Sequence, residues 1–575
     1  FILILFIYNK DNKMKKLIYI IAITTLFSCS DFLDVAPKGV LSEAQVSNAS
    51  VVDNTVNAAY ASLGNDHYDT PFSLWPYGNV RSGDAYKGGR DEGDIQAFYF
   101  LETFKNVRTD MGELDGLWFK MYVGVSRANS SLRVLNALNE ANFSLKKVRQ
   151  AEVRFLRAHF YFQLKILFKY IPFIDENVAI ADYATVSNRA LSNDQLWDKI
   201  AEDFQFAVDN LPATQTEIGR ANKAAALAYL AKTKLYQAYE QDEQNNVTVI
   251  NKTKLQQVVD LINAIPSTYG LDSDFGDLFS PGASENGKES LFAVQFSNKG
   301  DGTMFGRLNF GDVLATPMGI GCCDFHKPSK NLANAFKTDV NGLPLFDTYD
   351  ATPVNPAIDK VDPRLNHTIA MPGHPWKYDP TTIYQESWNR TPDVYGVYAS
   401  LKENVCKTCY TQVGPFYGNT KNRIILRYAD VILWKAEALI EIGGAANLDA
   451  ARQIINSIRT RAKNSTASLK MGDGSYESNF KIGTYDDPAI WNQDFARKAL
   501  RWERRLELAM EGNRFFDLVR WGIADTYMNA YFASEKSKIA YLKNGLFTKN
   551  RDEYCPIPDN QMRFSKGVYI QNAGY

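Results

Sequence analysis

The sequence predicts a mainly α-helical protein, a tetratricopeptide-like superhelix that carries a long irregular insert. Three segments, 151–170, 221–240 and 427–462, repeat apolar residues at three- and four-residue steps. The last segment forms a helical hairpin of about 36 residues, close to the tetratricopeptide period of about 34. Between 241 and 426 the composition changes to Gly, Pro, Asn, Asp and Thr, which is typical of loops with a few short strands.

The first strong helix is AEVRFLRAHFYFQLKILFKY, residues 151–170, in which Phe155, Phe162 and Ile166 share one face. We expect it to end before Pro172, because proline cannot continue a helix. The Ala-rich segment 221–240 predicts a second helix whose small residues allow close helix packing. Residues 118–138 are interpreted as part of a further degenerate hairpin of the same kind.

The hairpin at 427–462 has its own start and stop signals. A helix over 427–443 is closed by Gly443 and Gly444, and Asn447 is expected to cap the next helix, 447–462. The charged run 501–520, RWERRLELAMEGNRFFDLVR, predicts a structural helix with ion pairs along one face. Those pairs are Arg504 with Glu507, Arg514 with Asp517 and Asp517 with Arg520, beside an apolar stripe of Ala499, Trp502, Leu506 and Ala509.

The composition restricts the class of protein. The chain has 575 residues, 45% of them hydrophobic, and its 64 Lys plus Arg nearly balance 65 Asp plus Glu. Neither sign forms a long block, so the sequence lacks the basic patch of a nucleic-acid-binding protein. Aromatic residues make up 13%, and such amphipathic rings are favoured where a protein meets a ligand or partner.

The N-terminal region has the pattern of an export signal. We interpret Met14 as the true start, residues 1–13 as upstream translated sequence, and 14–28 as a signal peptide with two lysines before the apolar run LIYIIAITTLF. The stretch Leu26-Phe27-Ser28-Cys29 resembles a bacterial lipobox, so Cys29 is expected to be lipidated and to anchor the chain to a membrane. Residues 29–45 would then form the lipidated end and a linker.

Five further cysteines follow, and an exported protein meets an oxidising compartment. Cys322-Cys323 and Cys406-x-x-Cys409 are therefore candidates for disulfides, with Cys555 left over. A zinc site that includes His326 is the alternative, although the spacing matches no zinc pattern closely.

Motifs of catalysis are missing from the sequence. It contains no G-x-S-x-G elbow, no phosphate-binding loop ending in Gly-Lys-Ser/Thr and no H-E-x-x-H, and the Gly-rich stretch 83–93 has the wrong spacing to hold phosphate. We therefore expect no enzyme, no cofactor and no catalytic metal. An exported glycoside hydrolase, which needs two positioned carboxylates, is the weaker alternative.

The remaining class of function is ligand binding through aromatic rings and hydrogen bonds. Sugars stack their C–H faces on aromatic rings and pair their hydroxyls with polar groups, so a glycan site needs Trp or Tyr beside Asp, Asn or Arg. Two stretches, 73–89 and 374–390, have this composition. The candidate ligand-binding residues are Trp75, Tyr77, Arg81, Asp84 and Tyr86 in the first stretch and Trp376, Tyr378, Tyr384 and Trp388 in the second.

Several stretches together resemble the SusD/RagB family, the nutrient-uptake outer-membrane lipoproteins of Bacteroidetes. They are CSDFLDVAPKG at 29–39, LWFKMYVGVSRAN at 117–129, AEVRFLRAHFYFQL at 151–164, KVDPRL at 360–365, LRYADVILWKAEAL at 426–439, INSIRTRA at 455–462, ERRLELAMEGNRFFDLVRWG at 503–522 and the ending CPIPDNQMRFSKGVYIQNAGY at 555–575. The resemblance implies a helical part over 46–240, a loop-rich ligand region over 241–426 and a second helical part over 427–575.

The resemblance also implies a function. The protein would capture an oligosaccharide at the outer face of the outer membrane and pass it, without catalysis, to a TonB-dependent transporter of the SusC/RagA type. Peptide or glycopeptide cargo in the same role, and a tetratricopeptide adaptor that binds only protein, are the alternatives. The resemblance carries no ligand-contacting residue across, because the family's shared motifs are largely scaffold.

Overall fold

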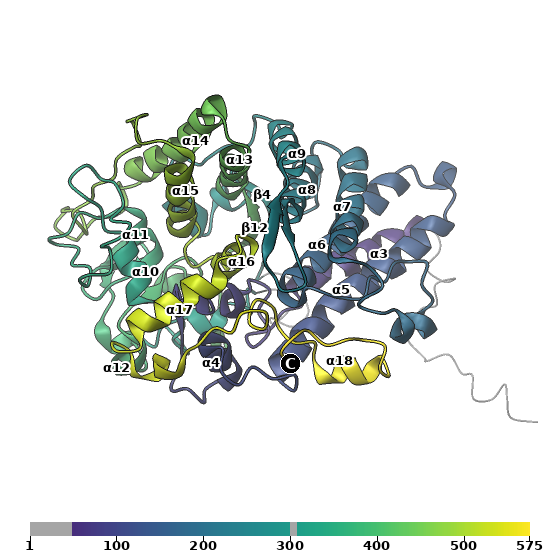
Figure 1. Ribbon diagram of the computed structural model, residues 1–575, viewed down its shortest axis with the longest axis horizontal. Coiled ribbons are helices and arrows are strands. Elements are labelled where there is room, and N and C mark those ends of the chain that lie inside the picture. The colour runs from purple at the N-terminus through teal and green to yellow at the C-terminus, as the bar shows by residue number, and fades with distance from the viewer. Residues whose placement is uncertain (1–48, 299–307) are drawn as a thin grey trace, which may run out of the picture.

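The computed structural model describes residues 49–298 and 308–575 (Figure 1). The expected upstream segment, signal peptide, lipidated Cys29 and linker lie outside the described residues. Within the described part, no helix is long and apolar enough to cross a membrane.

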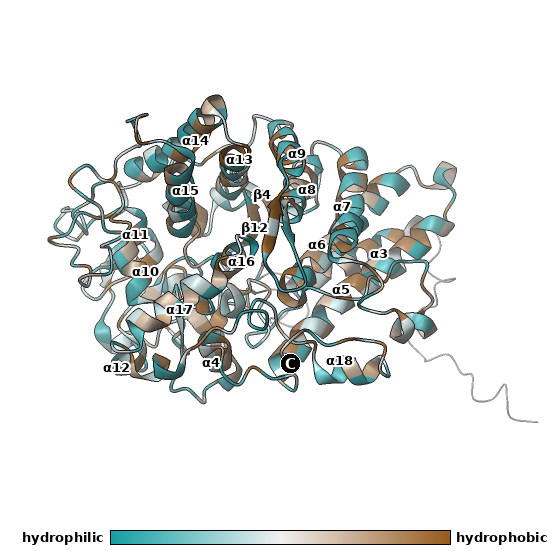
Figure 2. Ribbon diagram, in the orientation of Figure 1, coloured by the Kyte–Doolittle hydropathy of each residue, from teal (hydrophilic) through white to brown (hydrophobic). Residues whose placement is uncertain are grey.

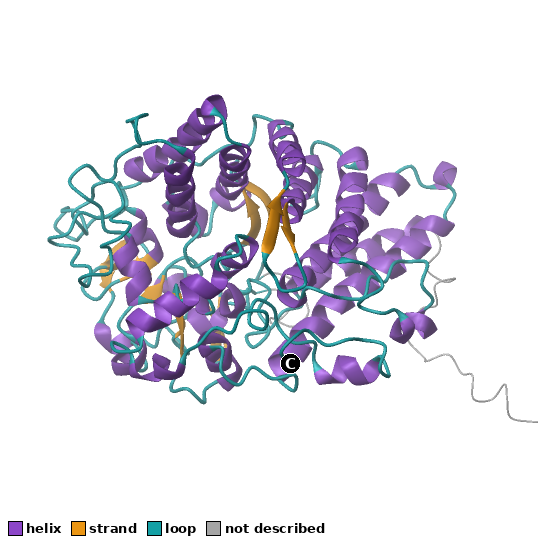
Figure 3. Ribbon diagram, in the orientation of Figure 1, coloured by secondary structure: helices purple, strands orange, loops and turns teal. Residues whose placement is uncertain are grey.

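The fold is mainly α-helical, as expected, and its helices form a continuous superhelical arc (Figures 1 and 3). Consecutive members of the arc pack against one another, and α13 packs on both α9 and α15. Figure 2 shows hydrophobic residues gathered on the inner strands β4 and β12, whereas the outer helix α15 is largely hydrophilic. The arc consists of α3 Ala49–Ala61, α5 Gly112–Ala137, α6 Lys146–Phe168, α7 Asn193–Asn210, α8 Lys223–Ala238, α9 Lys252–Asn263, α13 Tyr428–Ile442, α14 Ala445–Asn464 and α15 Gln493–Glu507.

The helices expected from periodicity are all present. Helix α6 stops at Phe168, short of Pro172, and α8 covers most of 221–240. One capping expectation was wrong: the N-cap of α14 is Gly444, and Asn447 lies one turn inside the helix. Its side-chain amide donates a 2.8 Å hydrogen bond to the Gly443 carbonyl. The two glycines both have positive φ, so they turn the chain tightly and let α14 start earlier than the apolar pattern indicates.

The insert begins later than the composition indicates. Helix α9 falls within 241–426, yet it packs on α8 and on α13 and so belongs to the superhelix. The irregular part therefore starts after Asn263. One of the short strands expected in this region is β4 Ser290–Val294, which pairs antiparallel with β12 Arg423–Arg427 at the end of the insert.

The remaining elements are short and lie mostly in the loop-rich half of the molecule (Figure 3). The helices are α4 Gln96–Thr103, α10 Lys330–Ala335, α11 Arg364–Thr368, α12 Pro392–Tyr395, α16 Arg514–Arg520, α17 Ala524–Glu535 and α18 Asp559–Phe564. The antiparallel strand pairs are β1 Ala85–Gly88 with β5 Phe325–Pro328, β2 Tyr239–Gln241 with β3 Val247–Ile250, β6 Ile369–Ala370 with β9 Ala399–Ser400, β7 Pro375–Trp376 with β8 Asp379–Ile383 and β10 Thr411–Val413 with β11 Phe416–Gly418.

The charged run 501–520 is not one helix. Helix α15 ends at Glu507, and α16 begins at Arg514 after a turn in which Met510 and Gly512 have positive φ. The Asp517–Arg520 ion pair is confirmed at 2.8 Å. The other two predicted pairs were wrong.

Arg504 bonds instead to Asp430 and Asp517, both at 2.8 Å, and Arg514 donates to the Arg501 carbonyl. Both predicted pairs keep their helical spacing, since Arg504 and Glu507 lie in α15 and Arg514 and Asp517 in α16. Their side chains nevertheless bond to partners on other elements. The predicted apolar stripe is largely buried: Ala499, Leu506 and Ala509 belong to the core, and Trp502 packs against it.

Candidate functional site

The first predicted ligand stretch lies in the core. None of its five candidate side chains is more than 2% exposed, so none has a surface open to an oligosaccharide. Trp75 stacks on His326 with ring centroids 4.9 Å apart, and Asp84 forms a 2.8 Å ion pair with Arg505. This corrects the expectation that Trp75, Tyr77, Arg81, Asp84 and Tyr86 face a ligand. Aromatic rings beside charged residues also occur in a buried core in which the charged groups pair with one another.

Two of the four candidate rings of the second stretch are half-buried, and the other two are buried. Trp376 and Tyr384 are fully buried, stack with centroids 5.8 Å apart, and satisfy their polar atoms internally. Tyr378 is half-buried and hydrogen-bonds His367 at 2.9 Å. Trp388 is also half-buried, and it packs edge-to-face on Trp376 and Tyr384 at 5.9 and 5.4 Å. This pair of buried rings fixes the orientation of the Trp388 indole.

The cysteines form disulfides. Cys322 is bonded to Cys323 and Cys406 to Cys409, while Cys555 is free and buried. His326, the histidine of the zinc alternative, pairs instead with Glu403 and with the Asn79 amide. Within the described residues, no group of three or more His, Cys, Asp or Glu side chains is arranged to hold a metal.

The turn 318–323, which carries the first disulfide, lies between two half-buried rings. A Cβ built on Gly319 would stand 2.2 Å from the Trp388 indole, and one on Gly321 would stand 2.5 Å from the Tyr417 ring. The backbone of the turn therefore lies directly against both rings. Met318, at the start of the turn, is 43% exposed and donates its N–H to the Trp388 carbonyl at 2.9 Å.

On the other face of β11, a second group of rings meets the surface. Phe416 and Tyr417 are neighbours on this strand, so their side chains point to opposite faces. Phe416 lies 5.1 Å from Tyr68 and 5.6 Å from the buried Phe310, measured between ring centroids. We name the four half-buried rings Tyr68, Trp388, Phe416 and Tyr417 the aromatic rim.

Polar groups accompany the aromatic rim. His67 hydrogen-bonds Asp69 at 2.7 Å, and both side chains are more than one third exposed. Partial burial alone would raise the pKa of Asp69. The bond to His67, the charges of His67 and Lys120 and the bond from Thr70 together outweigh burial and lower that pKa, so the carboxylate is ionised at neutral pH. The Lys407 ammonium lies 5.9 Å from the Trp388 ring centroid. Donors and acceptors for hydroxyl groups thus stand beside stacking surfaces.

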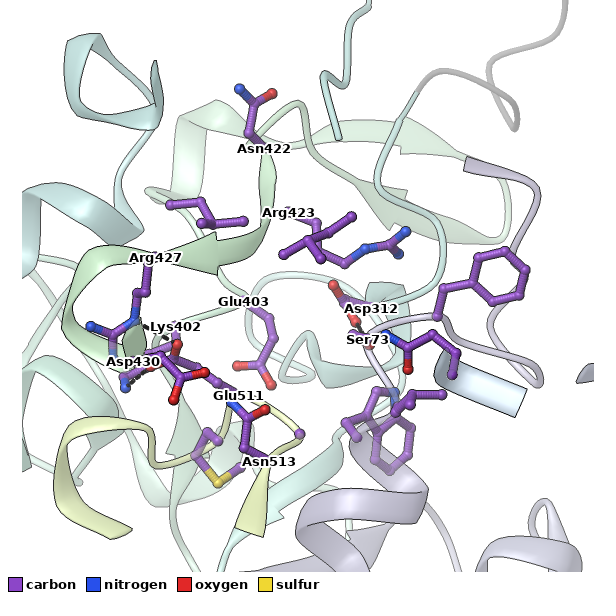
Figure 4. Close-up of a pocket in the computed structure, with 18 of the residues that line it drawn as sticks. Ser73, Asp312, Lys402, Glu403, Asn422, Arg423, Arg427, Asp430, Glu511 and Asn513 are labelled. Carbon is purple, nitrogen blue, oxygen red and sulfur yellow. Dashed lines mark hydrogen bonds and ion pairs between the residues drawn. The ribbon is translucent and has the colours of Figure 1, made fainter. Parts of the chain in front are cut away.

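A polar cavity of about 140 Å³ lies between the helical arc and the insert (Figure 4). Arg427 and Lys402 both reach Glu511, at 2.8 and 2.6 Å. At its other side, Ser73 donates to Asp312 at 2.5 Å. The labelled side chains in Figure 4 are Ser73, Asp312, Lys402, Glu403, Asn422, Arg423, Arg427, Asp430, Glu511 and Asn513.

The cavity adjoins the aromatic rim. Arg423 lines the cavity and pairs at 2.5 Å with Asp66, two residues before Tyr68. Asp312 lines it two residues after Phe310. Sequence reasoning found neither the cavity nor three of the four rim rings, because their residues come from separate loops and strands. The only local signal was the aromatic pair Phe416-Tyr417.

Comparisons with known proteins cover nearly the whole chain. A family model described as SusD family matches residues 288–575, and one described as starch-binding associating with outer membrane matches residues 31–235. SusD-like protein P2 of Formosa agariphila is 26% identical over 578 residues, which cover 98% of this chain and 100% of the relative. A SusD-like protein of Bacteroides ovatus is 26% identical over 529 residues, which cover 88% and 83%.

Solved structures share the fold. A laminarin binding SusD-like protein superposes with a TM-score of 0.66 at 22% identity, covering 92% of this chain and 100% of that one. Surface glycan-binding protein A from Bacteroides thetaiotaomicron, solved in complex with laminarihexaose, gives a TM-score of 0.60 at 20% identity over 91% and 99% of the two chains. At these identities the likeness concerns the fold alone.

Proposed function

The chain belongs to the SusD family, and from this membership we propose that it is a surface glycan-binding protein that delivers captured oligosaccharide to a partner transporter. The observation that carries the proposal is the aromatic rim, because half-buried rings fixed by packing and flanked by polar groups are what a sugar chain needs. Two structural neighbours, a laminarin binding protein and a surface glycan-binding protein, support the same role.

The rim would give reversible binding. Each stacked ring contributes about 1 kcal/mol beyond burial, and each hydrogen bond to a hydroxyl about 1 kcal/mol net. After the cost of association, a few such contacts leave a weak complex. Weak binding fits a protein that must release its cargo without changing it chemically, and proximity to the transporter raises the effective concentration.

Removing rim rings tests the glycan site. Trp388→Ala and Phe416→Ala are each expected to weaken binding of an oligosaccharide about tenfold, because each removes a stacking surface worth about 1–1.5 kcal/mol. Tyr476→Ala is the matched control, since Tyr476 is 53% exposed and lies outside the rim. Affinity electrophoresis in gels with different polysaccharides, followed by calorimetry on the best ligand, gives the comparison.

The outcomes separate the alternatives. If a glycan binds and both rim variants bind it as tightly as the native chain, the rim is not its site. If no glycan in a broad panel binds, the same assays with peptides and glycopeptides test the cargo alternative. If none of these ligands binds, a protein-binding adaptor remains.

The membrane anchor is a separate part of the proposal. We propose that Cys29 is lipidated and holds the protein on the outer face of the outer membrane, supported by the lipobox-like sequence and by the family description as associating with outer membrane. A Cys29→Ala chain expressed in the native organism is expected in the soluble fraction. If it remained membrane-bound like the native chain, the lipid anchor would be excluded.

The transporter is proposed as the partner from family membership. Crosslinking in intact outer membranes, followed by mass spectrometry, is expected to join the described helical body to one large outer-membrane protein. Recovery of the protein without any crosslinked β-barrel transporter, under conditions that crosslink a known membrane complex, would contradict this part.

A further inference from the structure

Two buried lysines that line the cavity of Figure 4 have no acidic partner in contact. Lys421 and Lys232 are 7% and 9% exposed. Within the described residues, neither ammonium makes a hydrogen bond or an ion pair. The Lys232 ammonium lies 5.3–5.9 Å from the ring centroids of Phe162, Tyr229 and Trp434. A buried ammonium without a hydrogen-bonded counterion is costly, so an anion that reached such an ammonium would be favoured.

The carboxylates around the cavity are already engaged. Glu511 is held by Arg427 and Lys402, and Glu403 by His326. Asp430 pairs with Arg504 at 2.8 Å. Asp312 accepts hydrogen bonds from Ser73 and from the Asn309 amide at 2.5 and 2.9 Å. None of the four lies within ion-pair distance of Lys421 or Lys232.

The cavity is also biased toward positive charge. Among the described residues that line it, five cations face four carboxylates. Burial and the nearby Arg423 and Lys232 lower the pKa of His159 to about 3, so its imidazole is neutral. Burial likewise lowers the pKa of Lys421. Burial also lowers the pKa of the neighbouring Lys377, and the positive charges of Lys421 and Lys402 lower it further. A bound anion would favour the charged form of these lysines.

The cavity has room for such a ligand. A volume of about 140 Å³ is close to that of a cavity known to hold a benzene-sized molecule. Phe72, Leu278 and Phe279 supply an apolar wall beside the charged groups.

We propose that this cavity binds a small organic anion, whose carboxylate is held by Lys421 while its carbon skeleton lies against the apolar wall. The site is distinct from the aromatic rim, and the inference does not depend on glycan binding. The same chemistry has two sources: a free carboxylate, or a uronic acid residue of a glycan whose neutral part lies on the rim next to the cavity.

Fluorine NMR of trifluoroacetate with the native protein tests the site. We expect line broadening that acetate and glucuronate reverse and that glucose or chloride at equal ionic strength does not. Lys421→Met should weaken trifluoroacetate binding on the order of tenfold, because it removes one charge-assisted hydrogen bond. Lys536→Met, at an exposed lysine, is the matched control and should bind like the native chain.

Displacement of trifluoroacetate by glucose or chloride, or unchanged binding in folded Lys421→Met, would overturn the proposal. If Lys421→Met does not fold, a crystal of the native protein soaked in acetate decides: we expect acetate within hydrogen-bond distance of the Lys421 ammonium. An acetate-free cavity in that crystal would also overturn the proposal.

The two sources differ in how they depend on the rim. For a free anion, acetate binding is weakened in Lys421→Met and unchanged in Phe416→Ala. For an acidic glycan, a uronate-containing oligosaccharide binds more tightly than its neutral analogue, and both variants weaken it. Glycan binding without any anion binding would refute only the cavity site, whereas anion binding without glycan binding would refute only the proposed function.

Discussion

Replacing Glu507 by glutamine is expected to destabilise the fold by about 3–5 kcal/mol, because it removes one charge from a buried ion network and leaves its cations underpaired. Glu507 is fully buried at the end of α15. Its carboxylate accepts hydrogen bonds from Arg364 at 2.9 Å, from Arg427 at 2.7 Å and from Arg461. Glutamine keeps the shape but offers only one acceptor oxygen and no charge.

The network links three parts of the chain that are distant in sequence. Arg364 comes from α11 in the insert, Arg427 from the end of β12, and Arg461 from α14. Arg364 also pairs with Glu503 at 2.6 Å, and Glu289 joins Arg427 and Arg461 at 3.1 and 3.0 Å. Because all these groups are buried, the loss of one carboxylate is not compensated by water.

Urea unfolding followed by circular dichroism measures the effect. Asp494→Asn is the matched control: it also removes an acidic charge on α15, but the Asp494 side chain is 94% exposed and pairs with Arg497 at the surface. The control is expected to change the free energy of unfolding by less than about 1 kcal/mol. Equal effects of the two substitutions would mean that the network contributes no more than a surface pair.

The sequence predicted the helices well because their signal is local. Apolar spacing within one segment reports which face is buried, whatever that face packs against. The ion network carries no such signal. Arg504 and Glu507 satisfy the three-residue spacing of a helical pair, yet Glu507 binds arginines 143, 80 and 46 positions away. Only the folded arrangement decides which charges become neighbours.

The same limit applies to the site. Composition marked Trp75 and Trp376 as strongly as Trp388, because a buried ring beside a paired charge and a ring beside a ligand have the same residue types. Tyr68 stands alone in its loop and gave no signal. Trp388 differs because its indole is only half-buried. It packs edge-to-face on the buried rings of Trp376 and Tyr384, and the backbone at Gly319 lies against it.

Acid is expected to remove several kcal/mol of stability as the pH falls below about 4. Burial alone would raise the pKa of Glu507, but Arg461, Arg427 and Arg364 outweigh it and hold that pKa well below the usual range. The pKa values of Glu511 and Asp517 are lowered against burial in the same way, by Arg427 and Arg504. A carboxyl with a lowered folded pKa contributes stability above its unfolded pKa of about 4, and this contribution is lost as the pH falls.

Some buried acids work in the opposite direction, and Glu102 is the example with the largest effect of burial. Burial raises the pKa of Glu102 to about 8, so its contribution to stability is greatest at low pH and is lost as the pH rises through about 8. It is constant below the unfolded pKa of about 4 and cannot reverse the acid loss. The depressed carboxyls set the slope in that range together with buried His159, whose pKa is lowered to about 3, at up to about 1.4 kcal/mol per pH unit for each group.

Comparing the native chain with Glu507→Gln over this range isolates one carboxyl of the network. At pH 7 the two free energies of unfolding should differ most, since Glu507 is ionised in both the folded and the unfolded native chain. Below pH 4 the unfolded native chain binds a proton at this position before the folded chain does, and the variant has no such proton to bind. The difference between the two proteins should therefore shrink by up to about 1.4 kcal/mol per pH unit. Urea unfolding at pH 7, 5, 4 and 3 measures it, and a difference that stayed constant would show that the charge of Glu507 does not stabilise the fold.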